Sequence, residues 1–172
     1  MSLCRYPWLG MHFLTNGESM VCPASQSSSS KGLTGERWAA GRSVVSLRNS
    51  EVLKKVRAEM LTGSLPADVC SRCLAEEKAG LPSWRMKTEA SFVVTDEELR
   101  SGTFEDGSVD PRRLPLQQLS LRLSNKCNLQ CQMCHPSSSR ALYEEWAELE
   151  KPRFRVGSEK VELIRGENGL RE

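Results

Sequence analysis

The sequence predicts an α+β N-terminal domain followed by the start of an α/β domain. Three patterns lead to this expectation. Apolar residues recur at helical spacing between residues 50 and 62, and leucines alternate with polar residues over 119–124. Three closely spaced cysteines then separate that alternation from a second helical pattern, so the expected C-terminal order is strand, cysteine loop, helix.

Composition and charge limit the classes of protein that this chain can represent. Its 172 residues suit one ordinary domain or two small ones, and a hydrophobic content of 38% with ten aromatic residues (four Phe, four Trp, two Tyr) favours a small core. The net charge of +2 has no basic block, so nucleic acid is not an expected partner. The first 14 residues lack the layout of a signal peptide, and no stretch is long enough to span a membrane. We therefore expect a cytoplasmic protein.

The first patterned helix follows a segment rich in serine and glycine. Residues 23–35 have the composition of a loop. Asn49 or Ser50 then caps a helix that Gly63 ends. The apolar positions of this helix are Val52, Leu53, Val56, Met60 and Leu61.

A second helix is expected from Asp68, its cap, through Glu77. It places Cys70 and Cys73 three positions apart on one face, so that both thiols point the same way. A segment rich in Asp, Glu and Gly follows and has the composition of a linker. The expected division is an N-terminal domain over 1–95, a linker over 96–113 and a C-terminal domain over 114–172.

The C-terminal domain is expected to begin with a strand. Alternation of leucine and polar residues over 119–124 is typical of a strand with one buried face. Serines at 137–139 can cap the helix that follows the cysteine loop. The apolar stripe of that helix is Leu142, Trp146 and Leu149. Beyond it the pattern is weak, with a short second strand expected over 161–164.

The cysteines favour metal binding over disulfides. They are seven, an odd number, and three of them, Cys127, Cys131 and Cys134, form a C-x3-C-x2-C motif. A cubane cluster needs one thiolate per iron, and short loops allow one segment to wrap three corners. Three ligands leave one iron bare, and an open coordination position distinguishes a reactive metal site from a closed structural one.

This motif resembles that of the radical SAM superfamily. The resemblance rests on C-x3-C-x2-C placed after a strand and on its neighbours, Leu121-Arg122-Leu123-Ser124-Asn125 and Cys127-Asn128-Leu129. It implies a partial α/β barrel, of which this chain holds the first strand, the cluster loop and the first helix. Since only 38 residues follow Cys134, we expect the chain to be a truncated form of such a protein.

The resemblance also implies cofactors and a reaction. Cys127, Cys131 and Cys134 would ligate a [4Fe–4S] cluster whose bare iron chelates S-adenosylmethionine. Reductive cleavage of that cofactor gives a 5'-deoxyadenosyl radical, which abstracts hydrogen from a substrate. Met133 would pack near the adenine, or serve as a plain core residue. The implied partners are an electron donor such as a flavodoxin or ferredoxin and an unknown substrate, possibly a peptide or protein.

The other four cysteines form a second set. Cys4 and Cys22 fit C-x12-G-x4-C around Gly17, and Cys70 and Cys73 form a C-x2-C pair. This set resembles the twitch domain, a shortened relative of the SPASM domain that holds an auxiliary [4Fe–4S] cluster. Cys4 and Cys22 would then end the two strands of a hairpin with a tight turn at Gly17. The expected roles of this cluster are electron relay and support of folding.

In some radical SAM proteins the twitch domain precedes the barrel, and this chain resembles that subgroup. The further segments that carry the likeness are Leu61-Thr62-Gly63, Cys70-Ser71-Arg72-Cys73, Glu76, Gly80 and Ser83-Trp84-Arg85. Arg165-Gly166-Glu167-Asn168 departs from the Gly-Gly-Glu-Pro that usually binds the methionine amino group, so Glu167 is only a weak candidate. No residue is assigned as catalytic.

Other functions remain open from the residues alone. Zinc can occupy the C-x3-C-x2-C loop, with His135 as a fourth ligand, or the set made by Cys4, Cys22, Cys70 and Cys73. The chain would then be a non-catalytic iron-sulfur or zinc module, such as an electron carrier. A further alternative is an inactive fragment of the enzyme.

Overall fold

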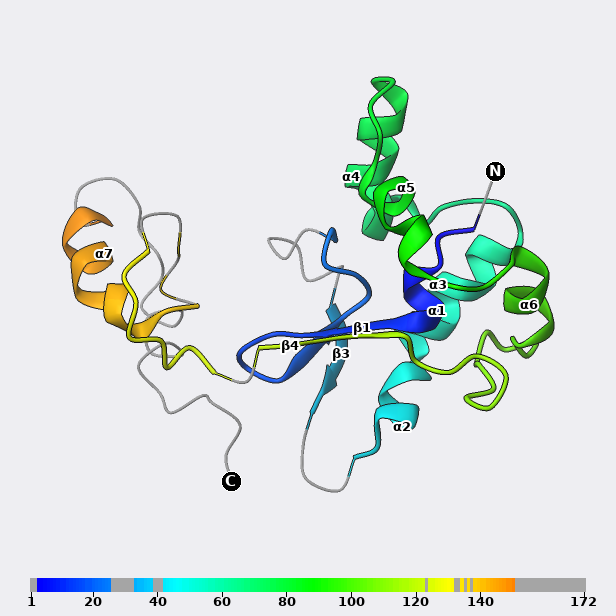
Figure 1. Cartoon of the computed structure of the whole chain (residues 1–172), viewed down its shortest axis with the longest axis horizontal. Helices are drawn as coiled ribbons and strands as arrows, with labels where there is room; N and C mark the ends of the chain where they lie inside the picture. The colour runs from blue at the N-terminus through cyan, green and yellow to red at the C-terminus, as the bar shows by residue number, and fades with distance from the viewer. Residues whose placement is uncertain are drawn as a thin grey trace. The chain divides into compact units, whose positions relative to one another are not determined.

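The computed structural model describes residues 3–25, 33–38, 42–122, 124–131, 134, 136 and 138–150. This part of the chain has a mixed α+β fold with seven α-helices and one small four-stranded sheet (Figure 1). The helices are α1 (Tyr6–Leu9), α2 (Val44–Arg48), α3 (Glu51–Leu61), α4 (Ala67–Lys78), α5 (Trp84–Thr88), α6 (Asp96–Ser101) and α7 (Tyr143–Glu150). The strands are β1 (Gly10–Phe13), β2 (Glu18–Met20), β3 (Leu33–Arg37) and β4 (Gln118–Leu121). Two short 3-10 helices, η2 (Glu89–Ser91) and η3 (Arg140–Leu142), complete the elements.

The chain divides into two compact units, which are described separately below. The first unit comprises residues 1–12 and 18–120, and the second comprises 13–17 and 121–172. The segment 96–113, expected to be a linker, belongs to the first unit and contains α6. The boundaries of the compact units therefore differ from those expected from composition.

The hairpin expected around Gly17 is present as β1 and β2. Gly17 has a φ of 80°, in the left-handed region, and its N–H donates to the Leu14 carbonyl at 2.9 Å. The expected places of the cysteines in this hairpin were wrong. Cys4 precedes α1 rather than β1, because the intervening residues form a helical turn, and Cys22 lies two residues beyond β2.

The sheet has the strand order β3-β2-β1-β4. β2 and β3 are antiparallel. The 119–124 pattern gives β4. On either side of this strand, the Gln117 N–H donates to the Leu9 carbonyl at 2.9 Å and the Arg122 N–H donates to the Phe13 carbonyl at 3.2 Å. Both strands advance in the same direction, so β4 is parallel to β1. The expected buried leucine face was wrong: Leu119 and Leu121 are 46% and 48% exposed, since no described residues cover that face of β4.

α3 confirms the first helix expected from the sequence. The Ser50 side chain caps it by accepting from the Leu53 N–H, and its buried positions include Leu53, Val56 and Met60. Gly63 follows its end with a φ of 94° and donates to the Met60 carbonyl at 3.0 Å.

α4 confirms the second helix but not its cap. Pro66 occupies the cap position, and Asp68 lies in the first turn, where a carboxylate complements the helix dipole. α5 lies beside α4 in Figure 1 and is capped by the Ser83 side chain, which accepts from the Met86 N–H.

Residues 96–113 are structured because they carry core side chains that composition did not reveal. Thr95 and Glu98 form a reciprocal capping box at the start of α6, and Leu99 is fully buried. Val109 is also buried. Gly107 has a φ of 80°, and a Cβ there would meet the Lys54 carbonyl oxygen at 2.1 Å, so this position requires glycine.

The core of the first unit gathers α1 against α3, α6 and the following loop. Its buried members are Leu3, Tyr6, Trp8, Leu9, Val21, Leu53, Val56, Met60, Val69, Phe92, Leu99, Val109 and Leu114. The rings of Tyr6 and Phe92 pack edge to face with centroids 6.0 Å apart.

Two buried arginines reinforce this small core. Arg57 donates from Nε to the Pro7 carbonyl at 2.9 Å and from Nη1 to the Gly107 carbonyl at 3.0 Å, and its Nη2 donates to the Arg48 carbonyl. Arg48 in turn donates to the Leu114 carbonyl at 2.9 Å. Burial lowers the pKa of both guanidinium groups. The two side chains thus satisfy carbonyl groups of the short helices α1 and α2 and of the loops at Gly107 and Leu114.

In the second unit, the helix expected after the cysteine loop is present as η3 and α7. Leu142 is buried and Trp146 is half-buried, while the side chain of Leu149 and the strand expected over 161–164 lie outside the described residues. Ser139 precedes η3 without a side-chain cap. No helix in the described ranges is long and apolar enough to cross a membrane.

Candidate metal centres

The first unit brings four cysteines to one cavity. Cys4 comes from the segment before α1, Cys22 from the segment after β2, and Cys70 and Cys73 from α4. The other residues that line the cavity are Pro7, Val21, Ala24, Met60, Val69, Arg72, Trp84 and Arg85. Its free volume is about 20 Å³, more than the about 10–15 Å³ that one water molecule requires. Three chain segments far apart in the sequence therefore meet at one set of thiols.

Burial and nearby negative charge favour the protonated form of Cys4, Cys22 and Cys70. Burial is the main cause that raises the pKa of Cys4 to about 12, and the negative charge of Cys22 and Cys73 adds to it. Burial also raises the pKa of Cys22 and of Cys70, and Cys70 is further raised by all three other cysteines. Negative charge on Cys22 and Cys73 thus disfavours ionisation of Cys4, and charge on all three of these cysteines disfavours ionisation of Cys70, so the sulfurs lie close together, and a bound cation would replace the protons.

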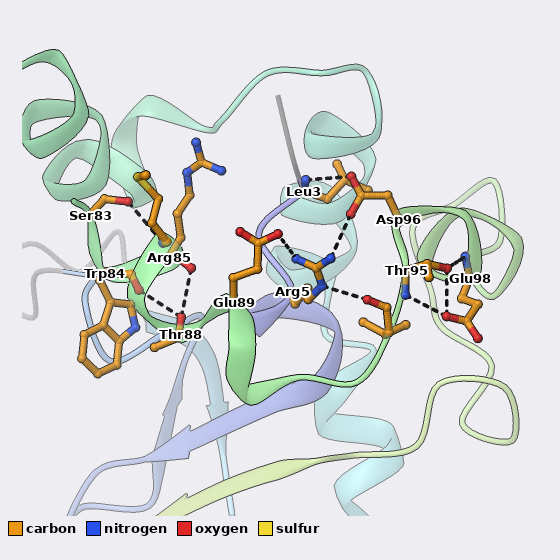
Figure 2. A network of polar contacts seen from close by, with 12 residues as sticks. Leu3, Arg5, Ser83, Trp84, Arg85, Thr88, Glu89, Thr95, Asp96 and Glu98 are labelled. Atoms are coloured by element: carbon orange, nitrogen blue, oxygen red, sulfur yellow. Dashed lines mark hydrogen bonds and ion pairs between the residues drawn. The ribbon is translucent and has the colours of Figure 1, made fainter. Parts of the chain in front are cut away.

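Neighbouring residues hold Cys4 in place on both sides (Figure 2). The Leu3 N–H donates to Asp96 Oδ2 at 3.2 Å, and the Arg5 guanidinium forms ion pairs with Glu89 and with Asp96, the latter at 3.7 Å. These contacts attach the N-terminal segment to η2 and α6. They position the Cys4 thiol from two directions, which sequence reasoning did not foresee.

Backbone N–H groups are directed at two of the sulfurs. Hydrogen bonds from the backbone of Tyr6 to Cys4, and from Ala24 and Ser25 to Cys22, lower the pKa of these thiols against the effect of burial. Such donors stabilise thiolates and the sulfurs of bound clusters.

Arg85, which lines the cavity, belongs to a charged pair. Arg85 makes a two-point ion pair with Glu77, with Nε to Oε1 at 2.6 Å and Nη2 to Oε2 at 2.7 Å. Ser83 Oγ donates to the same Glu77 Oε1 at 2.6 Å, and Figure 2 shows Ser83, Trp84 and Arg85 together at the start of α5. Arg85 lowers the thiol pKa of Cys4, opposing burial. Arg85 is therefore a positive charge at this site whose side chain is only 8% exposed.

The second unit holds the C-x3-C-x2-C loop in a more open setting. Cys131 is exposed, while Cys127 and Cys134 are partly exposed. The Leu129 N–H donates to Cys127 Sγ at 3.4 Å, and Ser139 Oγ donates to the Leu129 carbonyl at 2.7 Å. The hydrogen bond from Ser139, the residue before η3, thus folds the loop back on itself. Solvent can still reach the thiols of the loop.

A broad hollow of about 650 Å³ adjoins this loop. It lies between the loop and the start of α7, within the second unit, and Cys127 is the only cysteine among its lining residues in the part of the chain described. The others are Lys126, Asn128, Gln130, Arg140, Ala141, Tyr143 and Glu144. Polar groups therefore surround the open side of the loop.

The remaining candidates are placed as follows. Met133, His135 and Glu167 lie outside the described residues. Among those described, no group of three or more His, Cys, Asp or Glu side chains is arranged, as it stands, so that it could hold a metal ion. Sequence reasoning noted Arg85 only as part of a resemblance and gave Glu77 no role. The signal that pairs them is a carboxylate and an arginine eight residues apart across a Gly-Leu-Pro turn.

Comparisons with protein-family models, with curated proteins and with solved structures found no match to this chain.

Proposed function

We propose that this chain is an iron-sulfur protein of the radical SAM type, with an auxiliary cluster in its first unit and a cofactor-binding cluster in its second. The observation that carries the proposal is the meeting of Cys4, Cys22, Cys70 and Cys73 at one cavity. Four thiols from three segments satisfy every iron of a cubane, which leaves no open position there. This suits a cluster that relays electrons or supports folding.

The donor chemistry of the first unit fits such a group. The thiols are free, the backbone near two of them donates hydrogen bonds to sulfur, and Arg85 supplies positive charge. A bound cluster carries negative charge that these donors offset. The small hydrophobic core beside the cavity gives metal binding a further role, because ligation by distant segments adds directly to folding stability.

The three-cysteine loop supports the second half of the proposal. Cys127, Cys131 and Cys134 follow β4 and precede α7, and Cys131 is open to solvent. Three thiolates would hold a cluster with one free iron, and the chemistry supplied there is reductive cleavage of S-adenosylmethionine. The 650 Å³ hollow beside Cys127 offers polar groups on the side from which a cofactor would approach. An external electron donor such as a flavodoxin or ferredoxin and a peptide or protein substrate belong to the same proposal.

A second candidate is a zinc module at the four-cysteine cavity. The free volume of about 20 Å³ is close to the size of one ion, so zinc would require smaller movements of the thiols than a cubane, which requires the side chains to move apart. In that case the chain would be a structural or electron-carrier module, or an inactive form of the enzyme.

Anaerobic reconstitution with iron and sulfide tests the proposal. We expect about eight iron atoms per chain, four per cluster, and an electron paramagnetic resonance spectrum that S-adenosylmethionine perturbs. Cys131→Ala should lose about half of the iron and all of the perturbation, whereas its matched partner Cys73→Ala should lose a similar share of iron and keep the perturbation.

Three outcomes would count against this function. Uptake of one zinc per chain at the four cysteines with refusal of iron supports the zinc module instead. Clusters that S-adenosylmethionine leaves unchanged support a non-catalytic iron-sulfur protein. Bound cofactor that yields no 5'-deoxyadenosine after reduction supports an inactive form.

A further inference from the structure

The Glu77–Arg85 pair has features that a surface ion pair lacks. Its two hydrogen bonds are 2.6 Å and 2.7 Å long, and the Arg85 side chain is only 8% exposed. Surface pairs contribute little because water screens them and both side chains must be ordered. Here the order is already imposed, since Ser83 donates to the same carboxylate and the Trp84 N–H donates to Glu76 at 3.1 Å.

The pair is oriented with respect to the cysteines. Arg85 lines the four-cysteine cavity and Glu77 does not. The guanidinium interacts electrostatically with Cys4, Cys70 and Cys73, which come from two separate segments. Glu77 therefore acts as a fixed anchor that turns the positive end of the pair toward the thiols.

We propose that Glu77 and Arg85 set the charge of the four-cysteine centre: Arg85 offsets the negative charge of the ligated cluster, and Glu77 positions Arg85 and moderates its field. This inference rests on the proposed function. Reduction adds one electron to a cluster that is already negative, so a nearby buried cation favours the reduced form. Arg85 acts through its charge and need not touch the cluster, whereas Glu77 is the positioning residue.

Opposite shifts from the two partners provide the test. The experiment uses the full chain with Cys127, Cys131 and Cys134 each changed to Ala. After reconstitution, only the cluster at the other four cysteines remains. Its reduction is then measured by a redox titration followed by electron paramagnetic resonance. Arg85→Gln should lower the ratio of reduced to oxidised cluster about tenfold at a fixed potential, equal to a shift of about 59 mV for one electron. Glu77→Gln should raise that ratio by a smaller factor, about threefold, because Glu77 does not line the cavity.

Arg72 provides a matched control. It lines the same cavity, pairs with Glu76 at 3.0 Å, and carries the same charge, but its side chain is 54% exposed. Solvent should screen it, so Arg72→Gln should change the ratio less than about twofold. Arg85→Lys should stay close to the parent protein in potential, and the double variant Glu77→Gln with Arg85→Gln should return toward it.

The outcomes separate the inference from the function on which it rests. Equal shifts for Arg85→Gln and Arg72→Gln, or shifts of the same sign for Arg85→Gln and Glu77→Gln, would overturn the charge-setting role while leaving the cluster in place. Failure of the parent protein to take up iron at the four cysteines would instead reject the proposed function. Circular dichroism melting identifies variants that fail to fold. If Arg85→Gln is one of them, the test depends on the shift measured for Glu77→Gln, which keeps a hydrogen-bond acceptor for Arg85.

Discussion

The two cysteine sets of this chain differ in how much of each site exists before any metal binds. In the first unit, thiols from three segments gather around one cavity, where Cys73 is buried and the other three are partly buried, and hydrogen bonds on both sides hold Cys4. In the second unit, the three thiols share one short loop, and Cys131 is exposed. A site built from distant segments depends on the fold, whereas a local exposed loop depends on its own sequence. Under the proposed function, the first would hold a stable cluster and the second a cluster that admits a cofactor.

The largest effect is expected from a substitution of Arg57, whose hydrogen bonds lie within the first unit. Arg57→Met should lower the free energy of unfolding by about 3–5 kcal/mol, because several buried carbonyl groups lose their donor. Urea unfolding followed by tryptophan fluorescence measures it. Arg100→Met is the control: Arg100 also donates to a carbonyl, that of Leu61, but is exposed, so its loss should cost less than about 1 kcal/mol. Equal midpoints for the two variants would contradict the structural role of Arg57.

Thiol reactivity compares the two sets directly. In the reduced, metal-free protein at pH 8, Cys4 and Cys22 should react with iodoacetamide at least about 100-fold more slowly than Cys131, because burial raises their pKa and restricts access. Mass spectrometry of timed samples measures each site. Similar rates at Cys4 and Cys131 would show that the first site is not buried in solution.

The pH dependence of stability should come from the first set. The folded-state pKa of Cys4, about 12, lies above the ordinary thiol value of 9.0, so the folded state keeps protons that the unfolded state loses. Stability should therefore fall as the pH rises above 9, by about 1.4 kcal/mol at pH 10 from Cys4 alone. Urea titrations of the metal-free protein measure this slope. Cys4→Ser should flatten it and Cys131→Ser should not; an unchanged slope in Cys4→Ser would contradict the assignment.

The smallest effect is expected in the exposed loop. Ser139 is fully buried and donates to the Leu129 carbonyl at 2.7 Å, so Ser139→Ala should weaken the loop by about 1 kcal/mol. Amide hydrogen exchange of loop residues should then accelerate about fivefold, with α3 unaffected. Ser138→Ala, which changes the half-buried neighbour, should leave exchange unchanged. The same acceleration in both variants would mean that helix propensity, not this hydrogen bond, is responsible.

The features of the fold that the sequence predicted correctly are mostly local ones. α3 with its Ser50 cap, the length of α4, the turn at Gly17, the strand before the cysteine loop and the helix after it all follow from spacing and capping within a few residues. The cysteine spacings likewise identified the candidate ligands. These features depend on neighbours along the chain, which the sequence lists in order.

Tertiary structure decided the rest. β3 and the pairing of β4 with β1 depend on partners distant in sequence, and the segment 96–113 is structured because Leu99 and Val109 reach a core built by α1 and α3. The meeting of Cys4 and Cys22 with Cys70 and Cys73, and the direction of Arg85, also require the complete packing of the first unit. Sequence alone named the candidate metal ligands and, through the resemblance, grouped Cys4, Cys22, Cys70 and Cys73; only the fold brings these four to one cavity, because burial and long-range contacts are properties of the assembled chain.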